Sequence, residues 1–320
     1  MARKKHIVVI GGGTGTFTVL SALKKHPVRL TAIVSMADDG GSTGALRDQY
    51  GVLPPGDIRR ALVALSESSG TMRELFNYRF SGGELGGHSF GNLFLSSLEK
   101  LTGSFADAVA EASRILNVRG DVVPVTLNNV RLYARLSDGT VIKGETNIDI
   151  PRVKARKPIR RVWLEPKARI NPHARKAIMS ADLIVIGPGD LFTSIIPNLL
   201  VEGVAATIRR SPAKKVYIAN LMTKFGETNG FSAKDFISAI EEYLGKNSLD
   251  YALFNKRKPS KSLLTRYRRE RAEFVEPVGF DAARIRPRIV IADVLDRGPF
   301  IRHAPEHKLA RLLLSLIRRR

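Results

Sequence analysis

The chain of 320 residues contains no cysteine and a single tryptophan. Without cysteine, disulfides, thiolate metal ligands and cysteine nucleophiles are excluded. Long apolar runs are missing as well: glycines interrupt the run at residues 7–10, and no later segment approaches the roughly 20 apolar residues of a membrane span. We therefore expect a cytoplasmic protein with no membrane span.

Negative charge is scarce, since 52 lysines and arginines face 30 acidic residues and give a formal net charge of +22. The basic residues cluster at 152–176, 256–271 and 318–320. Such a surface could hold nucleic acid, or it could be a solvated face that attracts small anions. No aromatic residues interleave with the clusters as on a base-stacking platform, so we do not expect nucleic acid as the partner.

The hydrophobic pattern predicts an α/β fold. Dense β-branched residues at 7–10 predict a buried strand, followed by a helix at 17–25 and a second strand at 30–34. Further strands are expected at 183–186, 216–219, 251–254 and 289–294, with helices at 232–244, where Ser232 is the N-cap, and 309–317. This order predicts a Rossmann-like, doubly wound, mainly parallel sheet with helices on both faces.

The middle of the chain follows another pattern. Helical spacing recurs at 58–65, 73–80, 92–101 and 105–116, and antiparallel strands are expected at 122–127, 130–136 and 140–146, with Asp138-Gly139 as a hairpin turn. We predict one large domain, 1–320, with a β-rich hairpin insertion at about 121–164. The stretch 255–269 is expected to be the longest loop.

A glycine-rich loop follows the first predicted strand. Residues without side chains allow backbone N–H groups to approach phosphate oxygens, and the next helix adds its positive end. The dinucleotide pattern fails because Thr16 takes the place of its third glycine, and no Lys-Ser/Thr pair completes a Walker motif. The loop is either an anion site or a tight turn; the candidates for ligand contact are Gly12, Gly13, Thr14 and Gly15.

Acidic residues follow the second predicted strand. Ligand contacts gather at the carboxyl ends of parallel strands, so Asp38 and Asp39 could hold a ribose, a divalent metal or a hydroxyl. Alternatively, Asp39 or Ser42 caps the next helix. Asp57 in Pro54-Pro55-Gly56-Asp57 is read as a helix N-cap or as a partner of Asp39 in metal or phosphate chemistry.

Three further segments carry polar side chains beside glycines or at predicted strand ends. They contribute Asn92, in a segment that also holds His88; Gly187, Gly189, Thr193 and Ser194; and Asn220 with Thr223. Several such loops favour one shared cleft over unrelated turns. Hydrolase signatures such as G-x-S-x-G and H-E-x-x-H are absent, and the histidines show no metal-binding spacing.

Six motifs occur in order: G-G-G-T-G, A-D-D-G-G-S, P-P-G-D-I-R, G-H-S-x-G-N-L, I-G-P-G-x-L-x-T-S-I-I-P-N-L-L-V and N-L-M-T-x-x-G-E-T. Together they resemble the gluconeogenesis factor family, which is related to 2-phospho-L-lactate transferase. The resemblance covers residues 7–309 and implies a Rossmann-like fold that binds a UDP-sugar such as UDP-N-acetylglucosamine. It also implies a cytoplasmic role in growth and cell shape (morphogenesis) on gluconeogenic carbon sources.

The resemblance carries over site residues as well. By motif these are Thr14, Asp39, Asp57, Asn92 and the loop 187–194, while Tyr267 and Arg302 match positions that hold the uridine sugar. One residue departs from the pattern: Asp190 stands where the family usually has serine. A carboxylate near a diphosphate is unfavourable unless a cation neutralises it, so either Asp190 avoids the diphosphate or a metal is bound.

The sequence leaves three hypotheses about the function of this protein. The first is a non-catalytic regulator that binds a nucleotide sugar, UDP-N-acetylglucosamine-like, with no cofactor. The alternative is a phosphoryl or nucleotidyl transferase resembling 2-phospho-L-lactate transferase, with Asp39 and Asp57 as catalytic residues and Mg²⁺ ligands. The third is a basic nucleic-acid binder. The sequence leaves room for a homo-oligomer.

Overall fold

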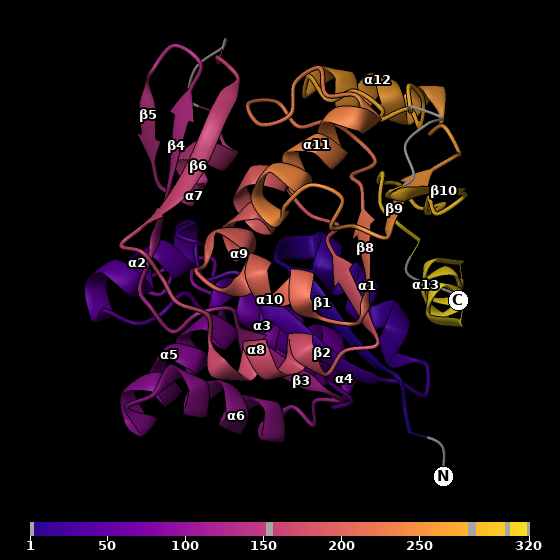
Figure 1. Cartoon of the computed structure of the whole chain (residues 1–320). Coiled ribbons are helices and arrows are strands. Elements are labelled where there is room, and N and C mark those ends of the chain that lie inside the picture. The colour runs from indigo at the N-terminus through magenta and orange to yellow at the C-terminus, as the bar shows by residue number, and fades with distance from the viewer. Residues whose placement is uncertain (1–2, 152–155, 281–285, 305–307, 319–320) are drawn as a thin grey trace.

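The computed structural model describes residues 3–151, 156–280, 286–304 and 308–318. Parts of the first and third basic clusters, residues 152–155 and 319–320, therefore lie outside the described residues. The elements alternate between strands and helices along most of the chain (Figure 1). No helix in the described ranges is long and apolar enough to cross a membrane.

A seven-stranded parallel sheet forms the centre of the molecule, in the order β10-β9-β8-β7-β1-β2-β3. The chain builds outward from β1 to β3 in one direction and then from β7 to β10 in the other, so β1 and β7 are neighbours, with Ile10 opposite Ile186. The strands are β1 His6–Gly11, β2 Arg29–Val34, β3 Asp121–Pro124, β7 Leu183–Ile186, β8 Lys214–Ile218, β9 Tyr251–Asn255 and β10 Arg288–Ala292.

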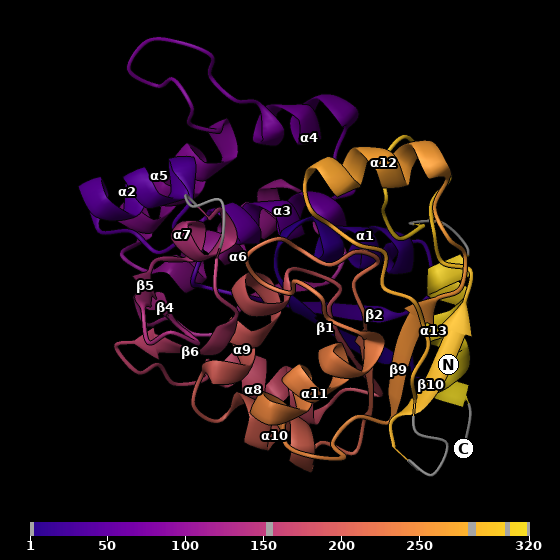
Figure 2. The ribbon, with the colours of Figure 1, turned by 90° about the horizontal axis from the view of Figure 1, so that it is seen from above.

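Helices cover both faces of this sheet (Figure 2). Helices α1 and α3 lie on one face and α8, α10 and α11 on the other, which confirms the doubly wound α/β prediction. The helices are α1 Gly13–Lys24, α2 Gly41–Tyr50, α3 Gly56–Leu65, α4 Gly70–Asn77, α5 Phe90–Thr102, α6 Phe105–Ile115, α7 Glu145–Asp149, α8 Pro172–Met179, α9 Ile196–Leu200, α10 Val204–Arg210, α11 Ala233–Leu244, α12 Lys261–Arg269 and α13 Lys308–Arg318.

Burial follows from the sequence pattern. All six residues of β1 and all four of β7 are buried, as expected for central strands of a sheet covered on both faces. Ser232 begins α11 as predicted, in a reciprocal capping box with Asp235. One cluster of buried hydrophobic residues continues from the main sheet into the small second sheet, and a single domain remains our interpretation.

The insertion is a three-stranded antiparallel sheet, β5-β4-β6, formed by β4 Arg131–Leu136, β5 Val141–Lys143 and β6 Ile159–Glu165. The predicted hairpin at Asp138-Gly139 joins β4 to β5. On this sheet Tyr133 stacks against Trp163, and the guanidinium groups of Arg135 and Arg161 lie over the Trp163 ring.

Three sequence expectations are wrong at this level, and the first concerns the strand expected at 140–146, which ends at Lys143 and is followed by α7 from Glu145. Residues 121–124 pair in parallel with β2 rather than entering the insertion, because Val122 and Val123 add to the edge of the main sheet beside Ala32 and Ile33. The stretch 255–269 is not a loop throughout, since the Ser260 hydroxyl caps α12 by accepting from the Leu263 N–H.

Candidate functional site

A cavity of about 410 Å³, here called the switch-point cavity, opens where the loops after β1 and β7 meet. The strand order reverses between these two strands, and open α/β sheets place their ligands at such a reversal. The loop after β8, helix α12 and the segment before α13 complete its walls. It is lined by Gly12, Gly13, Thr14, Gly15, Thr18, Pro188, Gly189, Asp190, Ser194, Asn220, Leu221, Met222, Thr223, Lys224, Phe225, Tyr267, Glu270, Ala272, Ile301, Arg302 and His303.

The first glycine loop is held by direct packing. A Cβ atom on Gly15 would lie 2.2 Å from the Pro188 carbonyl oxygen, so the loops after β1 and β7 touch at a point that only glycine permits. Gly13 has a positive φ of 66°, which favours glycine. The Gly13 N–H donates to the Asp57 carboxylate at 3.0 Å and is therefore already engaged.

Ten of the predicted ligand residues line the switch-point cavity: Gly12, Gly13, Thr14, Gly15, Gly189, Ser194, Asn220, Thr223, Tyr267 and Arg302. Asp38, Ser42 and Asn92 line a separate, smaller cavity. Gly187 lines neither; its N–H donates to the Ile10 carbonyl. The expected convergence of strand-end loops is thus present, although six of the predicted residues, Asp39 and Thr193 among them, lie outside this cavity.

Thr193 does not face the switch-point cavity either. Its hydroxyl donates to the Glu227 carboxylate at 3.0 Å, and the Phe192 N–H donates to the other oxygen of Glu227 at 2.9 Å. Glu227 is buried, and it fixes the π-helical turn Leu191–Ile195 that follows the second glycine loop. The role predicted for Thr193, a hydroxyl offered to phosphate, is therefore replaced by a structural one.

The predicted carboxylate pair Asp39 and Asp57 does not point to one centre. Asp39 accepts from the Thr146 N–H at 2.9 Å and lies 3.6 Å from Arg131, so it joins α2 to the insertion. Asp57 neither caps α3, whose N-cap is Pro55, nor reaches Asp39; it holds Gly13 and pairs with Arg60 at 3.5 Å. This geometry gives no support to a metal held jointly by Asp39 and Asp57.

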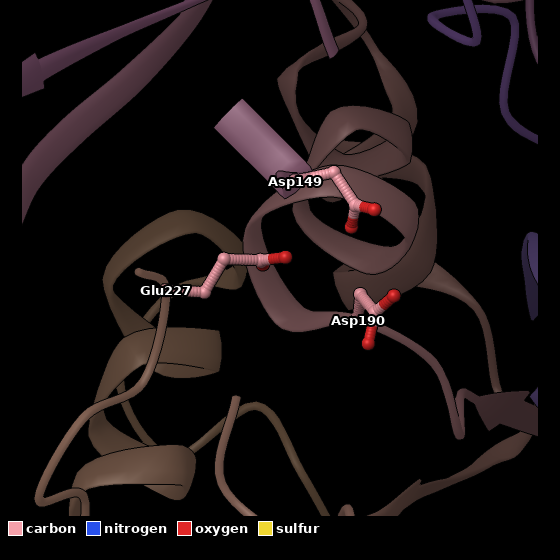
Figure 3. Close-up of side chains that lie close together, drawn as sticks. All are labelled: Asp149, Asp190 and Glu227. Atoms are coloured by element: carbon pink, nitrogen blue, oxygen red, sulfur yellow. The ribbon is translucent and has the colours of Figure 1, made fainter. Parts of the chain in front are cut away.

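Within the described chain, the group whose oxygens lie close enough to share a cation is Asp149, Asp190 and Glu227 (Figure 3). Their carboxylates come from α7, from the loop after β7 and from the segment before α11, and they turn toward one another. The Lys224 ammonium already bonds to this group: it contacts Asp149, lies 2.7 Å from Asp190 and 3.4 Å from Glu227.

The same ammonium explains how the chain tolerates Asp190. Burial disfavours the charged form of Lys224, but the three carboxylates outweigh it and raise its pKa above the usual value. Lys224 therefore stays charged and pairs with Asp190 at the rim of the cavity. The cation beside Asp190 is thus a lysine of the chain itself, and neither of the two expectations, a bound metal or an Asp190 that avoids the diphosphate, is tested by this contact.

The pKa values of two carboxylates behind the cavity are raised. Burial, followed by the neighbouring charge of Asp38, raises the pKa of Asp57 to about 6. Burial, followed by Asp38 and Asp149, raises the pKa of Glu145 to about 9. Near neutral pH, Glu145 is therefore mostly protonated, whereas Asp57 is protonated only in part.

The far wall comes from the C-terminal part of the chain. The Tyr267 hydroxyl accepts from the Ile301 N–H at 3.2 Å, and its ring packs with Leu221 and Leu295 in a small hydrophobic cluster. Arg302 is exposed, with its guanidinium 4.8 Å from the Phe300 ring. Both residues face the glycine loops across the cavity.

Sequence reasoning missed several residues of this region. They are Lys224, Glu145 and Asp149, together with the arginines Arg59, Arg60 and Arg79 of the smaller cavity. Lys224 directly follows the recognised N-L-M-T motif and was within reach of the sequence. Glu145 begins α7 where the end of a strand at 140–146 was expected, and Asp149 lies beyond that strand, so neither position gave a signal.

A family model described as 2-phospho-L-lactate transferase CofD matches residues 7–295. The chain belongs to this family. The chain is 43% identical to a protein named gluconeogenesis factor from Bacillus subtilis, over 99% of this chain and 100% of the relative. It is 44% identical to a gluconeogenesis factor from Halalkalibacterium halodurans, over 94% of this chain and 93% of the relative.

The fold has a close counterpart in crystal structures. A protein of Bacillus halodurans superposes with a TM-score of 0.91 at 40% identity, covering 99% of this chain and 100% of the other. Another crystal structure from this organism, described as a member of the UPF0052 family, gives the same score and identity. The Rossmann-like arrangement and the resemblance to gluconeogenesis factors are therefore confirmed.

Proposed function

We propose that the switch-point cavity binds a nucleotide sugar similar to UDP-N-acetylglucosamine, and that the protein is a regulator in the cytoplasm without catalytic activity. Its role would be that of a gluconeogenesis factor, required for growth and cell shape on gluconeogenic carbon sources. The observation that carries the proposal is the meeting of three strand-end loops with Tyr267 and Arg302 around one cavity. Its volume of about 410 Å³ is in the range of small-molecule sites, which begins near 300 Å³.

The diphosphate would lie against the N-terminus of α1. This twelve-residue helix begins without a side-chain cap, and its positive end faces the cavity at Thr14 and Gly15. Because Gly13 donates to Asp57, the donors left for phosphate in this turn are the following N–H groups and the Thr14 hydroxyl. Arg302 would add charge from the opposite wall, and Ser194 a second hydroxyl.

The uracil or sugar ring would pack on Tyr267. The hydroxyl of this tyrosine is fixed by the Ile301 N–H, so the ring is oriented before a ligand arrives. Lys224 keeps Asp190 from repelling the diphosphate. Recognition would thus combine an aromatic wall, one arginine and a helix terminus.

Isothermal titration calorimetry with UDP-N-acetylglucosamine tests this proposal. We expect saturable binding that weakens about tenfold in Tyr267→Ala, from loss of ring packing. Tyr50→Ala, which removes an exposed tyrosine on α2, is the matched control and should bind like wild type. Absence of binding at millimolar ligand, or equal affinity in Tyr267→Ala and wild type, would refute the assignment.

A transferase remains the second candidate because the family model carries the name of 2-phospho-L-lactate transferase. The acidic residues behind the α1 loop support it, since Asp38 lies close enough to raise the pKa of Asp57. Asp39 does not fit as a shared Mg²⁺ ligand, so only Asp57 is left beside the loop. Incubation with Mg²⁺, nucleoside triphosphates and 2-phospho-L-lactate, followed by ³¹P NMR, tests it: turnover lost in Asp57→Asn supports transfer, and no turnover with wild type excludes it.

A further inference from the structure

A second cavity of about 190 Å³, here called the arginine cavity, lies between α2, α3 and the start of α5. Neither candidate function described above uses it. It is lined by Asp38, Gly40, Gly41, Ser42, Thr43, Gly56, Arg59, Arg60, Arg79 and Asn92. Three guanidinium groups and one carboxylate therefore face a space large enough for a small molecule of a few heavy atoms.

Two of the three arginines form no ion pair with a described residue. Arg59 is only 6% exposed and donates to neutral acceptors, the side-chain oxygens of Asn92 and Asn77 and the Phe76 carbonyl. Arg79 donates to the Gly87 carbonyl. Over the described ranges, neither forms an ion pair, whereas Arg60 shares Asp57 at 3.5 Å.

This arrangement is electrostatically costly for the protein alone. Burial, followed by the like charges of Arg60 and Arg79, lowers the pKa of Arg59 to about 10. A buried charge without an ion-pair partner destabilises a fold, and like charges close by add to that cost, although the charges of Asp57 and Asp38 offset part of it for Arg59. An anion between the guanidinium groups would remove both penalties.

Polar donors surround the same space. Helix α2, ten residues long, begins at Gly41 with no side-chain cap. The Ser42 hydroxyl on its first turn is held by the Asn92 amide at 3.2 Å and by His88 Nδ1 at 3.1 Å, and Asn92 in turn accepts from Arg59. This network fixes a hydroxyl beside a buried guanidinium.

The single carboxylate of the cavity is already satisfied. Asp38 accepts from the Gly40 N–H at 2.9 Å and from the Thr43 hydroxyl at 2.9 Å, and burial raises its pKa. This one carboxylate is outnumbered by the three guanidinium groups of the lining. The cavity as a whole therefore favours an anion.

We propose that the arginine cavity is a binding subsite for a phosphoryl group, either free phosphate or the phosphate of a small phosphorylated acid. Guanidinium groups match phosphate oxygens through paired N–H donors, and the small volume excludes a nucleotide. The proposal does not depend on nucleotide-sugar binding. The two cavities are linked through Asp57, which holds Gly13 on one side and pairs with Arg60 on the other.

Calorimetry with inorganic phosphate at constant ionic strength tests the subsite. Arg79 lines the cavity from an exposed position, so Arg79→Gln should fold, and we expect it to weaken phosphate binding at least tenfold. Arg114→Gln removes an equally charged, exposed arginine on α6 and should bind like wild type. Addition of phosphate should also shift the His88 ring resonances in wild type, because His88 touches Ser42.

Arg302→Gln separates this subsite from the switch-point cavity. Phosphate binding retained in Arg302→Gln and lost in Arg79→Gln supports the proposal, whatever the outcome with UDP-N-acetylglucosamine. The reverse pattern, or no saturable binding by wild type, overturns it. Phosphoglycolate that binds tenfold more tightly than inorganic phosphate assigns the cavity to a phosphorylated acid, equal affinities assign it to free phosphate, and malonate binding as tightly as phosphate refutes the phosphoryl class.

Discussion

The contact between the two glycine loops can be tested by adding one methyl group to Gly15. In the folded chain the new Cβ atom would lie 2.2 Å from the Pro188 carbonyl oxygen and 2.6 Å from its carbon. Both partner atoms belong to the backbone, so no side-chain rotation relieves the overlap. The loops after β1 and β7 must move apart for Gly15→Ala to fold.

The expected magnitude follows from two opposing terms. Overpacking of a tight contact costs about 1–3 kcal/mol. Alanine is the better helix former by up to about 1 kcal/mol, and Gly15 lies in the first turn of α1. We therefore expect Gly15→Ala to lower the free energy of unfolding by about 1–2 kcal/mol and to weaken nucleotide-sugar binding, since the loops form the cavity floor.

Gly70→Ala is the matched control. Gly70 also lies in the first turn of a helix, α4, but a Cβ atom there would meet nothing within 4 Å. This variant should be as stable as wild type or more stable by up to about 1 kcal/mol. Urea denaturation measures both variants; equal stabilisation of the two would show that the glycine loops do not touch, and the packing argument would be wrong.

Two further predictions concern the acidic groups behind the cavity. Lys224→Met leaves buried Glu227 without its cation and should lower the free energy of unfolding by about 3 kcal/mol. Urea denaturation measures this loss, with Lys234→Met, which removes an exposed lysine, as the control. A loss below about 0.5 kcal/mol would contradict the role of the ion cluster. Burial raises the pKa of Glu145 to about 9, so the folded state holds a proton that the unfolded state releases near pH 4.5. The stability that this group contributes is therefore present below pH 4.5 and is lost as the pH rises toward 9. Glu145→Gln should reduce the fall in the free energy of unfolding between pH 5 and pH 8, measured by denaturation at both values. The same fall in Glu145→Gln and wild type would refute the raised pKa.

The parallel sheet was predictable because its strands carry a local signal. Dense β-branched runs such as residues 7–10 and 183–186 have no other stable place than a strand covered on both faces. The run at 122–127 has a similar composition, but sequence alone does not state its partner. Val122 joined the main sheet because β2 offered an open edge, which is a property of the assembled fold.

The candidate site was predictable to the extent that it is made of strand-end loops. The glycine motifs and Tyr267 can be recognised in the sequence, and the strand order brings them together in the folded chain. The ion cluster was not predictable, because its members come from three separate segments and Asp149 lies at the end of α7, a helix that the sequence pattern did not predict. The role of a charged side chain depends on partners that are distant in sequence, and only the folded structure shows which residues those partners are.

The glycines of the first loop are weak evidence for a bound ligand, because contacts within the protein already explain them. Gly15 is required by the Pro188 carbonyl, Gly13 by its positive φ, and a Cβ atom on Gly12 would lie 2.4 Å from an Asp57 oxygen. Each of these constraints holds without any bound molecule. Ligand binding must therefore be judged from charged groups that line the cavity, above all the exposed Arg302 guanidinium, which lies over the Phe300 ring. If Arg302→Gln left the affinity for UDP-N-acetylglucosamine unchanged, the loop would be a packing device, and the cavity would need another ligand.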